Sequence, residues 1–353
     1  MIVPVCLFIV GLLFLIKGGD WFVDGATGIA HRFQVPELLI GATVVSIGTT
    51  LPEVMVSATS AVGGHGEIAY GNAIGSIICN TALIAGLTIA IRPSRVERRT
   101  LRTPVAFFFT AAVFYALTAY VSGYFSRLAG LFLLLIFFVY MISTVMQVRK
   151  NSGQEEGELL LQAASLSEET VSHDSLNCDT DEAVLEENTG KDRLEGSMGK
   201  DLLLLFVGAA LIAVGAKLLV DNGTRIAQAL GVPESVIALT FVALGTSLPE
   251  LVTAITSLIK GHGALSLGNI IGANLFNLVL VSGLSVTLAP FEIPGNAMIA
   301  GHHASLVLDI PVMLFVMFFL TVPALIRERL TRLQGILLLL VYGVFCGIQF
   351  TLG

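Results

Sequence analysis

The hexapeptide GTTLPE at residues 48–53 recurs as GTSLPE at residues 245–250, and the repetition extends well beyond these positions. At an offset of 197 residues, the stretch 35–87 aligns without a gap to 232–284, with 24 identities in 53 positions. Chance does not produce an ungapped match of this length, so the chain contains an internal duplication.

The composition places both copies in a membrane. Of the 353 residues, 55% are hydrophobic and 13% are charged, whereas a soluble domain carries roughly 25% charged residues. The mean hydropathy is +0.86. These values exclude a water-soluble domain, a disordered chain and a nucleic-acid-binding protein. They predict an all-α integral membrane protein that crosses the bilayer several times.

Ten apolar stretches are candidates for transmembrane helices, which need about 17–25 residues. They cover 2–17, 37–62, 67–91, 104–121, 128–148, 201–220, 234–259, 264–289, 304–323 and 333–351. Residues 151–200 hold 13 acidic and 3 basic side chains, a composition typical of a solvated, loosely ordered segment. We therefore expect a first five-helix repeat over 1–148, an acidic linker over 149–200 and a second five-helix repeat over 201–353.

Five spans per half have a topological consequence. Because five is odd, the second half enters the membrane from the side opposite to the first. The two repeats are then inverted and related by a pseudo-twofold axis in the membrane plane, an arrangement that recurs among secondary transporters.

Basic residues indicate the orientation, since Lys and Arg gather in cytoplasmic loops. With the N-terminus outside, the outer loops contain Arg127 and Arg225. The inner loops then contain Arg32, Arg92, Arg95, Arg98, Arg99, Arg102, Arg149, Lys150, Lys260, Arg327, Arg329 and Arg332. We expect a multi-pass protein of the cell membrane, with both termini outside and the linker 149–200 in the cytoplasm.

Two carboxylates, Glu53 and Glu250, lie deep within apolar stretches at matching places in the repeats. An ionisable group at this depth costs on the order of 3 kcal/mol or more, and it usually marks an ion pathway or a proton relay. No Lys or Arg lies at a comparable depth to neutralise them. The expected partner is therefore a cation from solution.

The residues around both carboxylates supply further oxygen atoms. Helical spacing places Ser46, Thr49 and Thr50 on the face of Glu53, and Ala243, Thr246 and Ser247 on the face of Glu250. Pro52 and Pro249 each leave a backbone carbonyl four residues back without its donor, at Gly48 and Gly245. The next spans carry polar stripes at Asn72, Ser76 and Asn80, and at Asn269, Ala273 and Asn277. A set of hard oxygen ligands suits calcium or sodium and no soft transition metal, and we expect no resident cofactor.

At these residues the chain resembles a known family. G-T-[ST]-L-P-E, followed by G-N-x-[IV]-G-[SA]-x-x-x-N, occurs in both halves and is similar to the α-repeats of the sodium/calcium exchangers in the Ca2+:cation antiporter superfamily. The resemblance implies electrogenic exchange of several sodium ions for one calcium by alternating access at a midplane site. It implies side-chain ligands at Thr49, Thr50, Glu53, Ser76, Asn80, Thr246, Ser247, Glu250 and Asn277, with backbone oxygens of Ser46 and Ala243 completing the sodium sites.

The partners expected from this resemblance are calcium, sodium and membrane lipid, without nucleic acid or an obligate protein partner. It also implies that a gating bundle, the first and sixth helices, slides past the ion-binding core. No H-E-x-x-H, G-x-S-x-G or P-loop motif occurs, which argues against an enzyme and against ATP-driven pumping.

Two departures from the family pattern bear on the coupling ion. Ala273 stands where the family commonly has Ser, so one side-chain oxygen is missing from a presumed sodium site. Asn277 stands where some relatives, including the potassium-dependent branch, carry Asp, which favours potassium independence. The alternative function is a proton/calcium or other cation/calcium antiporter that uses the same carboxylates, since buried carboxylates also carry protons. A passive channel is a further rival, which the inverted repeat disfavours.

Other polar residues favour structural roles. Asn72 and Asn269 are expected to form interhelical hydrogen bonds. His65 and His262 lie in Gly-His-Gly turns, and Asp24 and Asp221 are expected to cap or anchor loops.

Overall fold

The computed structural model describes residues 2–147, 198–229, 245–294, 298–299 and 301–352. Within these ranges, nine helices are long and apolar enough to cross a membrane. The predicted multi-pass, all-α architecture is confirmed. The remaining predicted span, 234–259, is described from residue 245 onward and contains α10 (Leu248–Ile259).

The first half contains five spans, of which the second and third are built from shorter helical pieces. They are α1 (Ile2–Arg32), then α2 (Glu37–Ile40), η1 (Gly41–Val45) and α3 (Ser46–Val62), then α4 (Gly66–Ile78), η2 (Cys79–Ala85) and α5 (Gly86–Ile91), then α6 (Arg98–Ser122), and a helix over Arg127–Gln147. The η pieces are π-helical turns that continue the helices on either side of them.

The second half repeats this order. It contains α8 (Met198–Ala229), α10, α11 (Gly263–Phe276), η4 (Asn277–Val281), α12 (Ser282–Leu288), η5 (Ser305–Asp309), α13 (Ile310–Arg327) and α14 (Arg332–Leu352). Short strands β1 (Tyr124–Phe125) and β2 (Phe291–Glu292) pair with each other, as do β3 (Met298–Ile299) and β4 (His302–His303).

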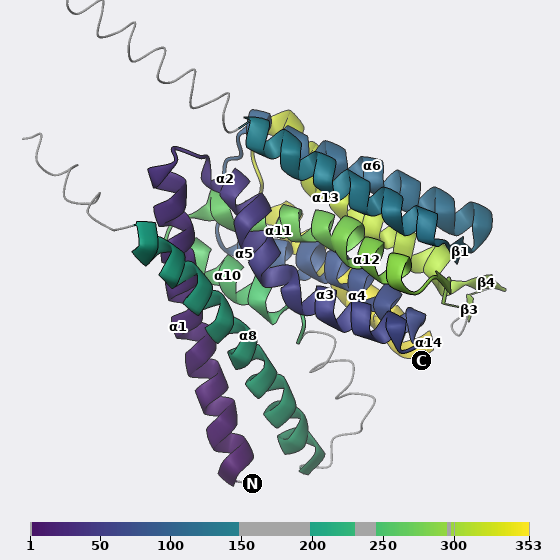
Figure 1. The fold of residues 1–353 in the computed structure, drawn as a ribbon, viewed down its shortest axis with the longest axis horizontal. Helices are drawn as coiled ribbons and strands as arrows, with labels where there is room; N and C mark the ends of the chain where they lie inside the picture. Colours follow the sequence, from purple (N-terminus) through teal and green to yellow (C-terminus); the bar gives the residue numbers. More distant parts are fainter. Residues whose placement is uncertain (1, 148–197, 230–244, 295–297, 300, 353) are drawn as a thin grey trace, which may run out of the picture.

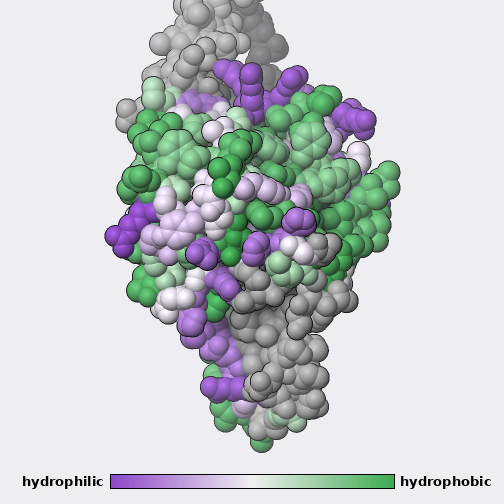
Figure 2. Space-filling model, turned by 90° about the vertical axis from the view of Figure 1, so that its right-hand side faces the viewer, coloured by the Kyte–Doolittle hydropathy of each residue, from purple (hydrophilic) through white to green (hydrophobic). Residues whose placement is uncertain are grey.

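Helix α11 lies at the centre of the molecule. Its residues from Leu265 to Phe276 are all buried. The outer helices instead expose apolar side chains such as Leu128, Phe138 and Phe318. Figure 2 shows hydrophobic residues over much of the body, with hydrophilic residues at the top of that view and also across its middle and lower left. Exposed apolar sides with polar ends are what a chain surrounded by lipid requires.

Helices α1 and α8 run side by side in opposite directions and extend away from the other helices (Figure 1). Both are longer than predicted, since the stretches 2–17 and 201–220 become Ile2–Arg32 and Met198–Ala229. The prediction ended the first span at Lys17 because charged residues follow it. Asp24 and Asp221 therefore lie within helices. The expected anchoring of a loop holds for Asp24, which binds Lys260 in the turn after α10, and is wrong for Asp221, which pairs within its own helix.

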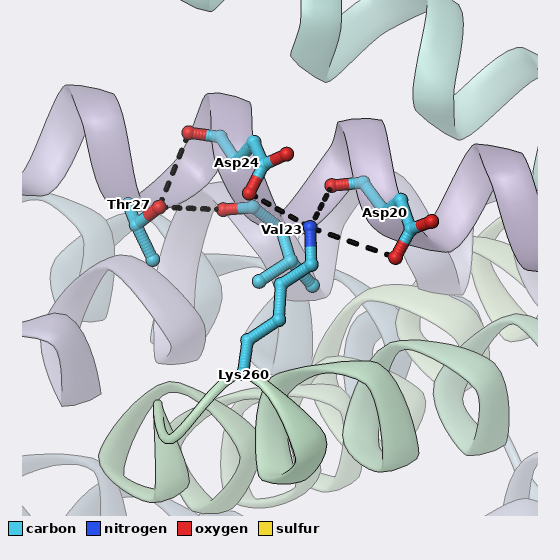
Figure 3. A network of polar contacts seen from close by, with 5 residues as sticks. All are labelled: Asp20, Val23, Asp24, Thr27 and Lys260. Carbon is cyan, nitrogen blue, oxygen red and sulfur yellow. Dashed lines mark hydrogen bonds and ion pairs between the residues drawn. The ribbon is translucent and has the colours of Figure 1, made fainter.

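Lys260 explains how α1 accommodates two aspartates (Figure 3). Lys260 ends α10, and its Nζ donates to the Asp24 carboxylate at 2.8 Å and to the Asp20 carbonyl at 2.9 Å. The Asp20 carboxylate lies 3.6 Å from the same Nζ. In the second half, Asp221 instead pairs at 3.1 Å with Lys217 of its own helix. The position equivalent to Lys260 in the first half is Gly63, which supplies no charge.

The contacts between α1 and α8 reveal the pseudo-twofold axis. A methyl group added to Gly11 would meet the Gly215 carbonyl at 2.9 Å, and one added to Gly18 would meet the Gly208 carbonyl at 2.9 Å. The 197-residue offset turns Gly11 into Gly208 and Gly18 into Gly215. The two contacts therefore exchange with each other, as a twofold axis demands.

Two further pairs of contacts obey the same symmetry. A methyl group on Gly86 would lie 3.1 Å from the Gly335 carbonyl, and one on Gly283 would lie 3.2 Å from the Gly130 carbonyl. A β-bridge joins Arg95 to Arg329, and the β1–β2 pair joins Tyr124 to Glu292. The 197-residue offset relates Gly86 to Gly283 and Arg95 to Glu292, whereas an offset of 205 relates Gly130 to Gly335 and Tyr124 to Arg329. With these two offsets, each contact becomes the other when the halves are exchanged. The inverted repeat predicted from the odd number of spans is thus present in the packing.

Substituting Gly208 with Val should disrupt the α1–α8 contact, because a methyl group there would lie 2.5 Å from the Phe22 amide nitrogen. Overpacking of this kind costs about 1–3 kcal/mol. We expect the melting temperature of the purified protein in detergent to fall by about 5 °C. Gly343→Val in α14 is the matched control, because a methyl group there meets nothing within 4 Å. Equal melting temperatures of the two variants would contradict the close approach of α1 and α8.

Candidate functional site

Glu53 and Glu250 are both fully buried, with 0% of either residue exposed. Glu53 lies in the middle of α3, and Glu250 lies in the first turn of α10. Helices α3 and α10 contact each other, so one carboxylate from each half is brought to the same region. This is the arrangement that the matching positions in the repeat predict.

Several buried polar atoms around these carboxylates have no hydrogen-bond partner. Among the described residues they include both carboxylate oxygens of Glu53, Oε2 of Glu250 and the side-chain amides of Asn80 and Asn277. Asn80 is the second residue of the π-helical turn next to α10, and Asn277 begins the one next to α3. Buried polar groups in proteins nearly always have a partner. Unpaired oxygens at one place fit a cation that binds there from solution.

Among the described residues, no positive side chain forms an ion pair with either carboxylate. The ion pairs of the described residues involve Arg32, Lys217, Lys260 and His262, and none of them reaches Glu53 or Glu250. The described residues also bring no three His, Cys, Asp or Glu side chains together. The site therefore combines two carboxylates with neutral oxygens, which is a ligand set for a hard cation.

Hydroxyl groups connect the two halves across the site. Thr50 donates to Oε1 of Glu250 at 3.4 Å, and Ser247 donates to the hydroxyl of Ser76 at 3.5 Å. Thr49 donates to the Asn269 side-chain oxygen at 3.2 Å, and Thr246 donates to the Asn72 side-chain oxygen at 3.2 Å. The last two contacts exchange under the 197-residue offset. The pseudo-twofold axis thus relates the two sides of the site.

Asn72 and Asn269 join helices, as predicted. The Asn72 amide donates to the Glu53 carbonyl at 3.2 Å and to the Ser57 hydroxyl at 2.8 Å, while its oxygen accepts from Thr246. Asn269 accepts from Thr49 in the same way. These bonds fix the carboxylate-bearing helices against the spans of the opposite half.

Three π-helical turns flank the site, and the sequence analysis did not predict them. Turn η1 ends immediately before Ser46, and η2 and η4 begin one residue before Asn80 and at Asn277. Such turns insert an extra residue into a helix and are frequent at functional sites. They shift the ladder of backbone hydrogen bonds at the positions from which the proposed ligands project.

The two prolines act differently from each other. Helix α3 continues through Pro52, whereas α10 begins at Leu248, so that Pro249 lies in its first turn. The predicted free carbonyl at Gly245 is instead an acceptor for the Leu248 amide at 3.4 Å. A proline in a first turn costs no hydrogen bond, so the prediction that Pro249 leaves the Gly245 carbonyl without a donor was wrong.

The structure brings most of the predicted site residues together. Those buried are Ser46, Thr49, Thr50, Glu53, Ser76, Asn80, Ser247, Glu250 and Asn277. Thr246 is half-buried, and Ala243 lies outside the described residues. Ala273 is fully buried on α11.

A half-buried carboxylate within the span Ser305–Arg327, Asp309, was not predicted. It ends η5 and accepts a hydrogen bond from the Gln349 amide of α14 at 2.7 Å. The signal was a single acidic residue within the apolar stretch 304–323. Because Asp309 has a neutral partner and no acidic counterpart in 104–121, it differs from the unpaired, duplicated Glu53 and Glu250.

Comparison with known proteins gives a consistent result. A family model described as sodium/calcium exchanger protein matches residues 3–146 and 200–351. The chain is 35% identical over 312 residues to the inner membrane protein YrbG of Escherichia coli (strain K12), covering 88% of this chain and 87% of that protein. It is 31% identical over 355 residues to the sodium/calcium exchanger MaX1 of Methanosarcina acetivorans, covering 98% and 97%.

The fold is also similar to a solved structure. The sodium-calcium exchanger NCX_Mj, from crystals soaked with sodium and strontium, superimposes with a TM-score of 0.75 at 30% sequence identity. The match covers 97% of each chain. Family and fold therefore agree over nearly the whole length.

Calcium should raise the melting temperature of the detergent-solubilised protein, because a ligand at 100 times its dissociation constant stabilises by about 2.7 kcal/mol. Glu53→Gln and Glu250→Gln should each abolish this rise, since each removes a charge while keeping the side-chain size. The calcium-free variants should melt no lower than the unaltered protein, because a buried unpaired charge has been removed. Glu292→Gln, at an exposed position in β2, should leave the effect of calcium unchanged. A full calcium shift in either buried variant would refute the assignment of these carboxylates.

Proposed function

The chain belongs to the sodium/calcium exchanger protein family, and we propose that its exchange site is formed by Glu53 and Glu250 with the oxygen atoms around them. The protein is a multi-pass membrane antiporter that exchanges sodium for calcium. The observation that carries the site assignment is the pair of fully buried carboxylates without an ion-pair partner among the described residues.

Two carboxylates can balance one divalent ion or two monovalent ions. Calcium suits carboxylate oxygens from both halves, supplemented by the hydroxyl of Thr50 and the amide oxygens of Asn80 and Asn277. Sodium ions would use the same carboxylates together with neutral hydroxyl and carbonyl oxygens. Because the ligand atoms are shared, the two kinds of ion compete, and competition at one site is the requirement for coupled exchange.

The pseudo-twofold axis gives a physical basis for alternating access. When two inverted repeats adopt slightly different conformations, exchanging those conformations opens the site to the opposite side of the membrane. The paired helices α1 and α8 contact each other through glycine and project from the other helices (Figure 1). This separation supports a moving α1–α8 pair, which the family resemblance also implies.

The orientation is also part of this proposal: a cell-membrane protein with both termini outside and the linker 149–200 in the cytoplasm. The positions of basic residues support it. Arg92 donates to the Leu258 carbonyl two residues before Lys260, and Arg95 forms a bridge with Arg329. Basic residues from both halves thus gather at one end, which by the positive-inside rule faces the cytoplasm.

The proton/calcium alternative uses the same carboxylates, and the neutral ligands distinguish the two. A proton needs only a carboxylate oxygen. The site also contains buried hydroxyl and amide oxygens, including those of Thr49, Ser76 and Asn277, which bind a metal cation and cannot take up a proton at ordinary pH. The surplus of neutral oxygens favours sodium as the coupling ion.

Proteoliposomes loaded with sodium should take up calcium-45 when diluted into sodium-free buffer, and those loaded with choline should not. The uptake should persist without potassium and with a protonophore present, because the coupling ion is sodium. Glu53→Gln and Glu250→Gln should nearly abolish it, whereas Glu292→Gln should retain it. Uptake that ignores internal sodium and follows a pH gradient would instead establish proton coupling.

Acidification should inhibit sodium-driven calcium uptake at fixed sodium and calcium gradients. Protons compete for the two carboxylates, and a protonated carboxyl group has lost the charge that holds calcium. Raising the calcium concentration should reverse part of the inhibition, because the competition is for the same oxygens. An initial rate that increases as the pH falls on both sides of the membrane would contradict this competition.

A further inference from the structure

The two halves differ in the same way at two positions near the site. The first half has Ser46 and Ser76, whereas the equivalent positions of the second half are Ala243 and Ala273. The second span of one half packs against the third span of the other, as the Thr49–Asn269 and Thr246–Asn72 bonds show. Position 46 therefore belongs with position 273. The 197-residue offset makes 243 and 76 the corresponding pair in the sequence, of which residue 243 lies outside the described residues. Each of these pairs contains one serine and one alanine.

The contacts of Ser46 support this pairing. Its hydroxyl lies 3.0 Å from the Asn269 carbonyl, which accepts the amide of residue 273 in the regular α-helix of α11. A methyl group on the neighbouring Gly272 would collide with the same hydroxyl. A serine at position 273 could bond back to this same carbonyl. The Ser46 hydroxyl is therefore close to the place that such a serine would occupy.

The oxygen atoms around Ser46 outnumber the available protons. The Ser46 hydroxyl lies 2.7 Å from the Gly41 carbonyl, 3.0 Å from the Asn269 carbonyl and 3.3 Å from the Asn269 side-chain oxygen. A hydroxyl has one proton, and the shortest of these contacts, to Gly41, takes it. The Ser46 hydroxyl then has no proton left for Asn269. Its lone pairs face the carbonyl and the side-chain oxygen of Asn269, which are acceptors as well.

A cation resolves this crowding of acceptors. The Thr49 hydroxyl lies 3.2 Å from the Asn269 side-chain oxygen and 3.4 Å from the Ser46 carbonyl, which adds two more oxygens to the group. Ser46, Thr49 and Asn269 are each at most 2% exposed. A buried group of neutral oxygens without a carboxylate of its own matches a monovalent hard cation better than a divalent one.

We propose that the Ser46 hydroxyl is a sodium ligand that replaces the side-chain oxygen absent at Ala273. The inference rests on the proposed function and adds a residue to its sodium site. Each of the two pseudo-equivalent regions then keeps one hydroxyl from its pair, at Ser46 on one side and Ser76 on the other. Compared with a serine at position 273, Ala273 removes one sodium ligand from α11, and Ser46 supplies one from α3. The number of sodium ligands is therefore unchanged.

A structural role for the same hydroxyl has to be separated from this one. Ser46 donates to the carbonyl five residues back and thereby closes η1, and Ser282 makes the equivalent bond at 3.1 Å to Asn277 after η4. A variant that loses the hydroxyl loses both functions. Ala273→Ser in the same variant returns an oxygen to the sodium region, but it cannot restore the bond to Gly41.

The experiment compares the unaltered protein with Ser46→Ala, with Ser46→Ala/Ala273→Ser and with Thr43→Val. Thr43, which lies one turn before Ser46, is the matched control. Among the described residues its hydroxyl bonds only to the Leu39 carbonyl. Two quantities are measured: the internal sodium concentration that half-saturates calcium-45 uptake, and the sodium concentration that half-saturates the rise in melting temperature in detergent. Calcium–calcium exchange, measured without sodium, shows whether the calcium site remains folded in each variant.

Ser46→Ala should raise both sodium concentrations about fivefold or more, the effect of losing an interaction of roughly 1 kcal/mol. Calcium–calcium exchange should persist in Ser46→Ala as evidence of a folded calcium site. Both sodium concentrations in Thr43→Val should stay within about twofold of the unaltered protein. Ala273→Ser should return the double variant to within about twofold of the original sodium dependence.

Unchanged sodium dependence in Ser46→Ala would overturn the proposal. So would a double variant that remains as impaired as Ser46→Ala, because closure of η1 would then account for the loss. Failure of the proposed function has a different signature, since the unaltered protein would then show neither sodium-driven uptake nor stabilisation by sodium.

Discussion

The structure depends on one electrostatic constraint: two carboxylates, Glu53 and Glu250, are fully buried, and no ion pair in the described part of the chain reaches either of them. In a low-dielectric interior an uncompensated charge is costly, and two neighbouring ones repel each other as well. The interior therefore has to offer oxygen ligands that let a cation supply the missing charge. In the proposed site, the buried hydroxyls of Thr50 and Ser76 and the buried amide of Asn80 serve this purpose, although each would be unfavourable in an apolar core.

Duplication of one five-helix unit, with the second copy inverted, produces this arrangement. One copy of the motif contributes a single carboxylate, and an inverted second copy brings its own to the same depth from the opposite direction. The exchange of contacts between Gly11–Gly215 and Gly18–Gly208 shows that the whole framework obeys the same axis. Because the site lies where the halves meet, a change in their relative conformation necessarily changes access to it. Binding and movement are thereby properties of one interface.

Much of this could be predicted from the sequence, because burial of charge leaves a clear pattern. The spans 37–62 and 67–91 agree with the helices to within one residue, and the motif residues do meet. The predictions failed where a contact distant in sequence decides the outcome. Asp24 looked like a loop residue because its partner, Lys260, is more than two hundred positions away. The π-helical turns left no signal, since an extra residue per turn depends on packing and not on residue type.

The symmetry is broken in two places, and the two breaks differ physically. At the helix ends, Lys260 joins α10 to α1, and Gly63 makes no equivalent contact, so the halves differ in charge there. Near the carboxylates, both serines belong to the first half, and Ser46 of α3 lies beside the α11 segment that carries Ala273, so in the proposed site a hydroxyl absent from α11 is supplied by α3. An exposed end can gain or lose a charge at little cost because water screens it. A buried ion site cannot lose a ligand without losing its ion, so there a change on one helix requires a compensating change on the helix that faces it.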